Sequence, residues 1–161
     1  MSANGDGDGE AAAAGPAGAP GLAGAVSVAE AWIDAVVWGD HGKVWALIGV
    51  EGRTELLEVA TKRGMDEGLA ARLSTDAASP GETSEFLTDL VNGLRSELAG
   101  NDLDHITYEI DDAESTPDRA AVKMFVPLHP AFGGTLPIGT VFLAVEGTDW
   151  RVARLIPITS K

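Results

Sequence analysis

The chain has 161 residues, a formal net charge of -14 and no cysteine. This composition excludes disulfides and thiolate chemistry, and it argues against nucleic acid or a membrane surface as a partner, because both are negatively charged. The first ten residues hold no Lys or Arg, and no apolar run approaches the ~20 residues that span a bilayer. We therefore expect a cytoplasmic protein with one domain, and the abundance of Ala and Gly suits a bacterial source.

Residues 1–26 are rich in Ala, Gly and Pro, which supply 18 of the 26 positions. Such a segment buries too little apolar surface to offset its ordering entropy, so we expect a disordered acidic tail that is dispensable for folding. The expected domain then covers residues 27–161. A capping box formed by Ser27 and Glu30 predicts the start of its first helix, which ends at Gly39.

Three further helices are predicted before residue 100. Asp40 is a suitable N-cap for a short second helix that ends at Gly49. A third helical pattern follows and ends at Gly64. Ser79 begins a second capping box, and the fourth helix runs from there with one apolar face to Gly100.

After Gly100 the hydrophobic period changes from about 3.6 to 2, which indicates strands. The links between the strands are too short for crossover helices, so antiparallel pairing is expected. The predicted strands cover residues 106–110, 120–126, 136–146 and 150–158.

The third strand is apolar on both faces. Alternation places Val141, Leu143 and Val145 on one side, and Ile138, Phe142 and Ala144 on the other. The helices can cover only one face of the sheet, so the second face needs a partner. We therefore expect a homodimer formed through the sheet.

Three segments resemble the superfamily of nuclear transport factor 2 and ketosteroid isomerase, also called SnoaL-like. The segments Ala31–Asp40 and Val44–Ile48 resemble its opening helix pair, and Asp149–Ala153 resembles its last hairpin. The resemblance implies a cone-like α+β barrel in which N-terminal helices pack on a curved antiparallel sheet around an apolar cavity. A ferredoxin-like α+β sandwich is the alternative, but it needs strands interleaved with the helices.

Four residues are candidates for lining such a pocket: Trp32, Asp34, Tyr108 and Arg154. Trp32 belongs to a cluster with Trp38 and Trp45, for which core packing is the simpler interpretation. Asp34 lies one helical turn after Glu30, where exposure to solvent is the simpler interpretation. Tyr108 and Arg154 alternate with apolar residues, and a polar group on an apolar face marks a pocket, an interface or a rim.

No catalytic motif is evident, and the catalytic residues are unknown. The steroid isomerase pattern needs a tyrosine, an aspartate base and a protonated acid, and it has no match here. The three histidines, His41, His105 and His129, are far apart, so neither a metal nor a cofactor is expected. The residues favour a small-molecule-binding protein with an apolar cavity. The alternatives are a lyase or isomerase acting on a hydrophobic substrate through Asp34 or Tyr108, and a non-catalytic dimeric scaffold.

Overall fold

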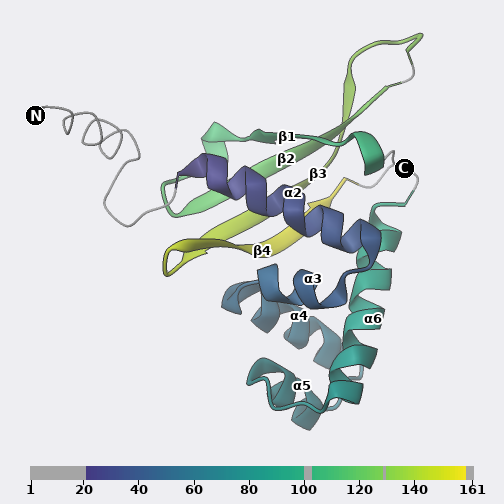
Figure 1. The fold of residues 1–161 in the computed structure, drawn as a ribbon, viewed down its shortest axis with the longest axis vertical. Coiled ribbons are helices and arrows are strands. Elements are labelled where there is room, and N and C mark those ends of the chain that lie inside the picture. Colours follow the sequence, from purple (N-terminus) through teal and green to yellow (C-terminus); the bar gives the residue numbers. More distant parts are fainter. Residues whose placement is uncertain (1–20, 100–102, 129, 159–161) are drawn as a thin grey trace, which may run out of the picture.

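The computed structural model describes residues 21–99, 103–128 and 130–158, and within them the chain has an α+β fold. Five helices come first and a four-stranded antiparallel sheet follows (Figure 1). The helices are α2 (Leu22–Trp38), α3 (His41–Leu47), α4 (Val50–Lys62), α5 (Glu67–Ser74) and α6 (Pro80–Glu97). The strands are β1 (Thr107–Ile110), β2 (Arg119–Pro127), β3 (Thr135–Glu146) and β4 (Asp149–Pro157).

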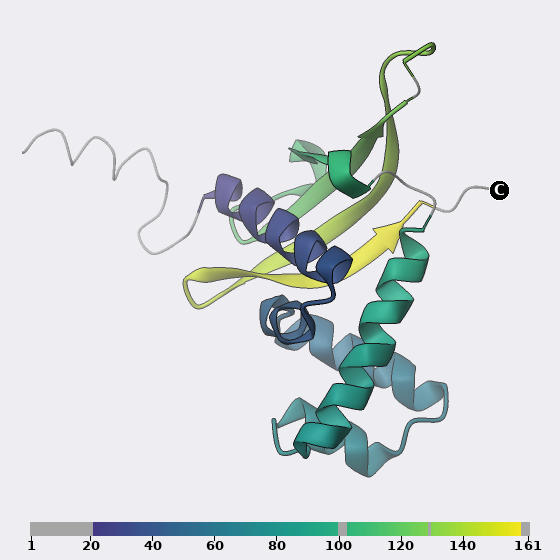
Figure 2. The same ribbon diagram turned by 45° about the vertical axis from the view of Figure 1, so that its right-hand side comes forward.

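The sheet is a simple meander in the order β1-β2-β3-β4, with every neighbouring pair antiparallel. The expected antiparallel pairing is therefore confirmed. No α-helix lies between the described strands, only a 3₁₀ turn at Asp112–Glu114, and this rules out the ferredoxin-like alternative. Helix α2 lies across one face of the sheet, while α3 to α6 gather beyond β4 (Figures 1 and 2). The opposite face of the sheet has no described helix over it (Figure 2).

The first helix begins at Leu22, so the prediction that order starts at Ser27 is wrong. Ser27 lies inside α2, and its hydroxyl donates to the carbonyl of Ala23 at 3.4 Å instead of capping the helix. Ala25 is fully buried, and the Trp150 indole donates to the carbonyl of Gly21 at 2.9 Å. These tertiary contacts extend the helix through residues that the composition assigned to the tail. The rest of that expected tail, residues 1–20, lies outside the described residues.

The other predicted helix starts are confirmed. Asp40 caps α3 by accepting a hydrogen bond from the backbone amide of Lys43 at 3.3 Å. At α6 the Ser79 hydroxyl accepts from the Glu82 amide, and the Glu82 carboxylate accepts from the Ser79 amide. Both halves of this capping box are present, so two orphan donors of α6 are satisfied locally.

The main core lies between α2 and the sheet. Trp32, Ile33 and Val36 of α2 are buried there. The sheet contributes a matching set of buried side chains, namely Ala120, Val122, Met124, Val126, Ile138, Val141, Leu143, Trp150 and Val152. The apolar side chains on this face of β2 and β3 are buried against α2, so hydrophobic burial holds the helix on the sheet.

Two register shifts change the expected facing of side chains. One shift lies beside Met124 and leaves Ile138 without a partner on β2. Ile138 is buried in the same core as Val141. Ile138 was expected on the opposite face, and that expectation is wrong because a bulge resets the alternation. The second shift, at Phe142, sets Arg154 opposite Phe142. Simple alternation predicted that Arg154 lies on the same face as Val152. That prediction is wrong, because the shift places the two residues on opposite faces.

Helix α4 is fixed to the end of the sheet by three close approaches. The amide of Val50 donates to the Glu146 carboxylate at 2.7 Å, across 96 positions of sequence. The amide of Gly49 donates to the carbonyl of Val152 at 2.9 Å. A side chain at Gly52 would lie 2.8 Å from that same carbonyl oxygen. Glycine is needed at position 52 because the helix and strand backbones meet there. The described part of the chain has no helix long and apolar enough to cross a membrane.

Candidate functional site

The structure separates the three clustered tryptophans. Trp32 is 2% exposed, and its indole nitrogen donates to the carbonyl of Val44 at 3.1 Å, which ties α2 to α3. Trp45 is also buried, so core packing is confirmed for both side chains. Trp38, by contrast, is 81% exposed at the end of α2, and core packing is the wrong interpretation for it.

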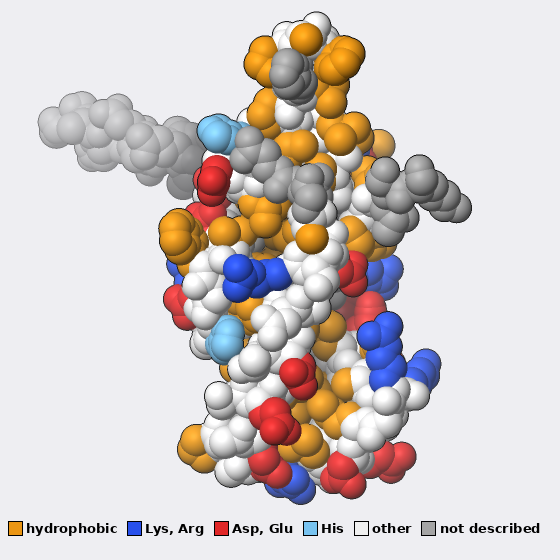
Figure 3. Space-filling model, turned by 90° about the vertical axis from the view of Figure 1, so that its right-hand side faces the viewer, with side chains coloured by type: hydrophobic (Ala, Val, Ile, Leu, Met, Phe, Trp, Pro, Cys, Tyr) orange, Lys and Arg blue, Asp and Glu red, His pale blue; other side chains and the backbone are white. Residues whose placement is uncertain are grey.

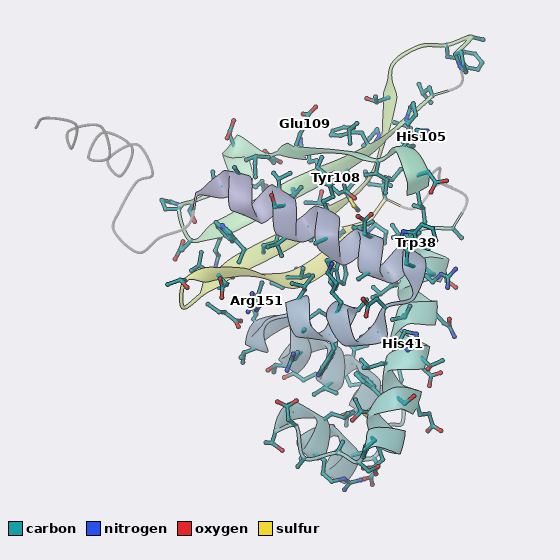
Figure 4. All side chains as sticks on the ribbon, in the orientation of Figure 1. Trp38, His41, His105, Tyr108, Glu109 and Arg151 are labelled. Carbon is teal, nitrogen blue, oxygen red and sulfur yellow. The ribbon has the colours of Figure 1, made fainter. Side chains whose placement is uncertain are left out.

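Asp34 and Tyr108 lie near each other at the edge of the molecule. Tyr108 extends from β1 toward α2 and is half-buried, whereas Glu109 points away from α2 (Figure 4). Burial raises the pKa of the Tyr108 phenol, and the negative charges of Asp34 and Glu30 raise it further. Both carboxylates are exposed on α2. The phenol therefore stays protonated across the physiological range and is a poor proton donor.

Arg154 and Trp32 reach a different place, which is the inner end of a groove beside β4. The Arg154 guanidinium pairs with the Glu55 carboxylate at 3.2 Å, and about half of the arginine side chain is exposed. The four predicted pocket residues thus form two separate pairs. Asp34 and Tyr108 do not line the groove.

The groove runs between α4 and α6, and we call it the α4–α6 groove. It consists of two adjoining hollows, of about 190 and 450 Å³, that share the side chains of Leu56, Val59, Leu94 and Glu97. Figure 3 shows hydrophobic side chains along the lower half of this face, with acidic side chains beside them. Its apolar lining comes from Leu56 and Val59 of α4, Met65 and Leu69 beyond it, and Phe86, Leu90 and Leu94 of α6.

The lining is apolar but only partly covered by protein. Leu56, Leu90 and Leu94 are half-buried, and Val59 is 41% exposed. At one end Phe86 is buried against Trp45, with ring centroids 5.2 Å apart and an edge-to-face angle of 81°. Aromatic pairs of this geometry add to the energy of burial and so stabilise this end of the groove. The middle of the groove is left open.

The rim of the groove carries an excess of carboxylates. Glu82 pairs with Arg72 at 2.7 Å, and this hydrogen bond lowers the pKa of the Glu82 carboxyl. Glu85, Asp89 and Glu97, which also line the groove, have no ion pair among the described residues. The opposite wall carries Arg63, at the end of α4, which also has no ion pair among the described residues. The local field is therefore negative.

Gly93 lies inside α6 and also lines the groove. A side chain added there would meet no atom within 4 Å, so packing does not require glycine. Glycine in a helix interior costs about 0.5–1 kcal/mol relative to alanine. Glu85 and Asp89 are four residues apart, and like charges at this spacing cost roughly 0.2–0.5 kcal/mol more. Helix α6 thus carries two features that weaken the helix and keep the groove open and negative.

The sequence pattern placed Phe86, Leu87, Leu90, Val91, Leu94 and Leu98 on one apolar face. In the structure this face divides. Phe86, Leu87, Val91 and Leu98 are buried, while Leu90 and Leu94 are only partly buried and line the groove. Helical periodicity alone does not distinguish a covered stripe from an open one. The signal that could have revealed the groove was the combination of an unexplained Gly93 with the carboxylates at positions 85, 89 and 97.

Metal ligands do not gather in the described residues, where no group of three or more His, Asp or Glu side chains is placed to hold an ion. His41 and His105 lie on different elements (Figure 4), and His129 lies outside the described residues. Comparisons with known proteins identify no relative: no family model matches the chain, and neither a curated protein nor a solved structure matches it.

Proposed function

We propose that this protein binds a small apolar molecule in the α4–α6 groove and does so without catalysis. The observation that carries the proposal is the groove itself, with partly buried Leu56, Leu90 and Leu94 lining hollows of about 190 and 450 Å³. Ligand sites are concave, mostly apolar and of this order of size. The parts of these leucine side chains that contact water are unfavourably hydrated. A ligand that covers them gains free energy of binding from their burial.

The proposal includes a distant place in the superfamily of nuclear transport factor 2 and ketosteroid isomerase, with a cone-like arrangement. Its support is the chain order, in which helices precede an antiparallel meander and α2 lies across the sheet. The segment Ala31–Asp40 runs from α2 to the N-cap of α3, Val44–Ile48 lies in α3 and its C-cap, and Asp149–Ala153 lies in β4. Fold alone does not assign activity, so the function is argued from the groove.

A lyase or isomerase is less well supported than a binding protein. Such an enzyme needs a proton-transfer group whose pKa lies near the working pH. Burial and two nearby carboxylates move the pKa of Tyr108 upward, away from that range. Asp34, its acidic neighbour on α2, is exposed to solvent and stands outside the groove.

We also propose that two copies associate through the uncovered face of the sheet. That face carries Phe125, Phe142 and Ala144, which are half-buried, and Ile156, which is 45% exposed. Apolar side chains on an open sheet face favour burial against a second copy. The groove is lined mainly by α4 and α6, although its inner end reaches Arg154 of β4, so binding and dimer formation are tested with separate variants.

The test of binding uses 1-octanol as a neutral apolar probe in calorimetric titration. An eight-carbon chain buried in the groove supports a dissociation constant on the order of 0.1–1 mM after the cost of association. Gly93→Leu fills the groove and should abolish binding. Gly81→Leu is the matched control, because it adds the same side chain to the first turn of α6 in open space. Equal binding by both variants would contradict the proposal.

A further inference from the structure

The acidic rim gives the groove a preference in charge that the apolar lining does not explain. Glu85, Asp89 and Glu97 follow one another along α6 at spacings of four and eight residues, on the side that also carries Leu90 and Leu94. Residues four apart lie on the same helix face. An acidic row and an apolar row therefore run side by side along the same groove.

The basic side chains near the groove do not balance this row. Arg154 is held by Glu55 at 3.2 Å and Arg72 by Glu82 at 2.7 Å. Arg63, at the end of α4, is the remaining arginine of the lining. The same lining holds three carboxylates that have no ion pair among the described residues. A negatively charged ligand would be repelled by this excess.

Resting on the binding function proposed above, we propose that the natural ligand is an amphiphilic organic cation. Its apolar body lies along Leu56, Leu90 and Leu94, and its ammonium or similar group lies at Glu85 and Asp89. The open space at Gly93 admits the ligand against the backbone of α6. This occupant also accounts for two carboxylates placed four residues apart, because a bound cation removes their repulsion.

The size of the hollows favours a small molecule over a helix of another protein. An α-helix with its side chains is about 10–12 Å across, whereas the inner hollow, next to Trp32 and Arg154, has a volume of only about 190 Å³. The outer hollow, at about 450 Å³, lies within the range of ligand pockets. The chemistry fits a chain or ring system that carries one positive charge.

The experiment compares three eight-carbon probes on the full chain by calorimetric titration, namely octyltrimethylammonium, 1-octanol and octanoate. We expect the cation to bind about five- to tenfold more tightly than the alcohol, and octanoate to bind more weakly than both. The advantage of the cation should shrink as salt rises from low to high ionic strength, because exposed charges are screened.

The charge is tested by the double variant Glu85→Gln/Asp89→Asn. It should bind the cation about five- to tenfold more weakly, whereas its affinity for 1-octanol should change by less than about twofold. The matched control is Asp112→Asn/Glu114→Gln, which removes the same number of charges beside the sheet. If the control weakens cation binding equally, the effect is one of overall charge and the inference is overturned.

The remaining outcomes separate the inference from the function on which it rests. Binding of 1-octanol that Gly93→Leu abolishes, with no preference for the cation, would overturn the inference and leave the proposed function intact. Failure of all three probes would overturn both. A change of oligomeric state on Gly93→Leu, measured by light scattering, would show a second copy in the groove and would also overturn both.

Discussion

The two halves of the molecule use apolar residues in opposite ways. Between α2 and the sheet, Trp32, Val122 and Leu143 are buried almost completely and belong to one core cluster. Between α4 and α6, Leu90 and Leu94 are only partly buried along an open groove. The first half therefore supplies most of the stability, and the second is free to accept a ligand.

The same substitution in each half gives the largest contrast. Leu143→Glu places an unpaired carboxylate in the closed core and should lower the free energy of unfolding by more than about 4 kcal/mol. Leu90→Glu lets its carboxylate reach water in the groove and should cost roughly 1–2 kcal/mol. Chemical denaturation of both variants measures the difference. Similar losses in the two variants would show that the halves are equally well packed.

Truncation at the N-terminus tests how far the closed half extends. Deleting residues 1–26 removes buried Ala25 and the acceptor that Gly21 offers to Trp150, and it should cost roughly 2–4 kcal/mol. Deleting residues 1–20 leaves these contacts in place, so its thermal midpoint should match that of the full chain. If both truncations melt alike, the first turn of α2 does not contribute to the core.

Two glycines sharpen the comparison at the level of a single methyl group. Gly52→Ala forces a contact 2.8 Å from the carbonyl of Val152 and should destabilise the protein by about 1–3 kcal/mol. Gly93→Ala meets open space and should stabilise α6 by about 0.5–1 kcal/mol. Opposite signs in denaturant midpoints are expected. A destabilising Gly93→Ala would mean that the groove wall is packed more tightly than described.

The uncovered face of the sheet provides a third environment. Phe142→Glu changes a half-buried residue on the side opposite Leu143 and should cost about 1 kcal/mol in the folded protomer. It should also convert the expected dimer to a monomer, because a charge is buried in the interface. Light scattering at micromolar concentration measures this change. A wild-type chain that is already monomeric would contradict the proposed dimer.

The smallest effect concerns the single tyrosine and appears only in alkali. The phenol of Tyr108 has a pKa above its ordinary value of about 10, because of burial first and the charges of Asp34 and Glu30 second. The stability this supplies is complete below the unfolded pKa and is lost as pH rises through the higher folded pKa. Absorbance titration of the phenolate should therefore show a raised midpoint. Asp34→Asn should lower that midpoint, and an unchanged one would contradict the assigned contribution of Asp34.

Local signals in the sequence predicted the fold well where local energetics decide. Ser79 and Asp40 cap their helices as expected, since each needs only its own first turn. Ser27 offers the same signal and is not a cap, because Ala25 and Trp150 hold an earlier turn in place. The facing of Ile138 and Arg154 was missed for a related reason. A bulge depends on pairing between strands, which the period of one strand does not contain.

The candidate site was less accessible to sequence reasoning. Trp32 was chosen from an aromatic cluster and Arg154 as a polar residue on an apolar face, and both reach one end of the groove. Tyr108 was chosen on the same grounds as Arg154 and Asp34 for its helical spacing, and both lie elsewhere. The open stripe at Leu90 and Leu94 has the same period as a buried one. Whether a neighbour covers such a stripe depends on how helices diverge in space, and no helix encodes that alone.

The bond between the Trp150 indole and the carbonyl of Gly21 spans 129 positions of the chain. During synthesis at about 5–20 residues per second, roughly 6–26 s separate the appearance of these two partners. Helix α2 leaves the ribosome long before any strand exists to receive its apolar side. The closed half of the molecule is therefore completed only after β4 has been made, although α2 precedes that strand by most of the described chain.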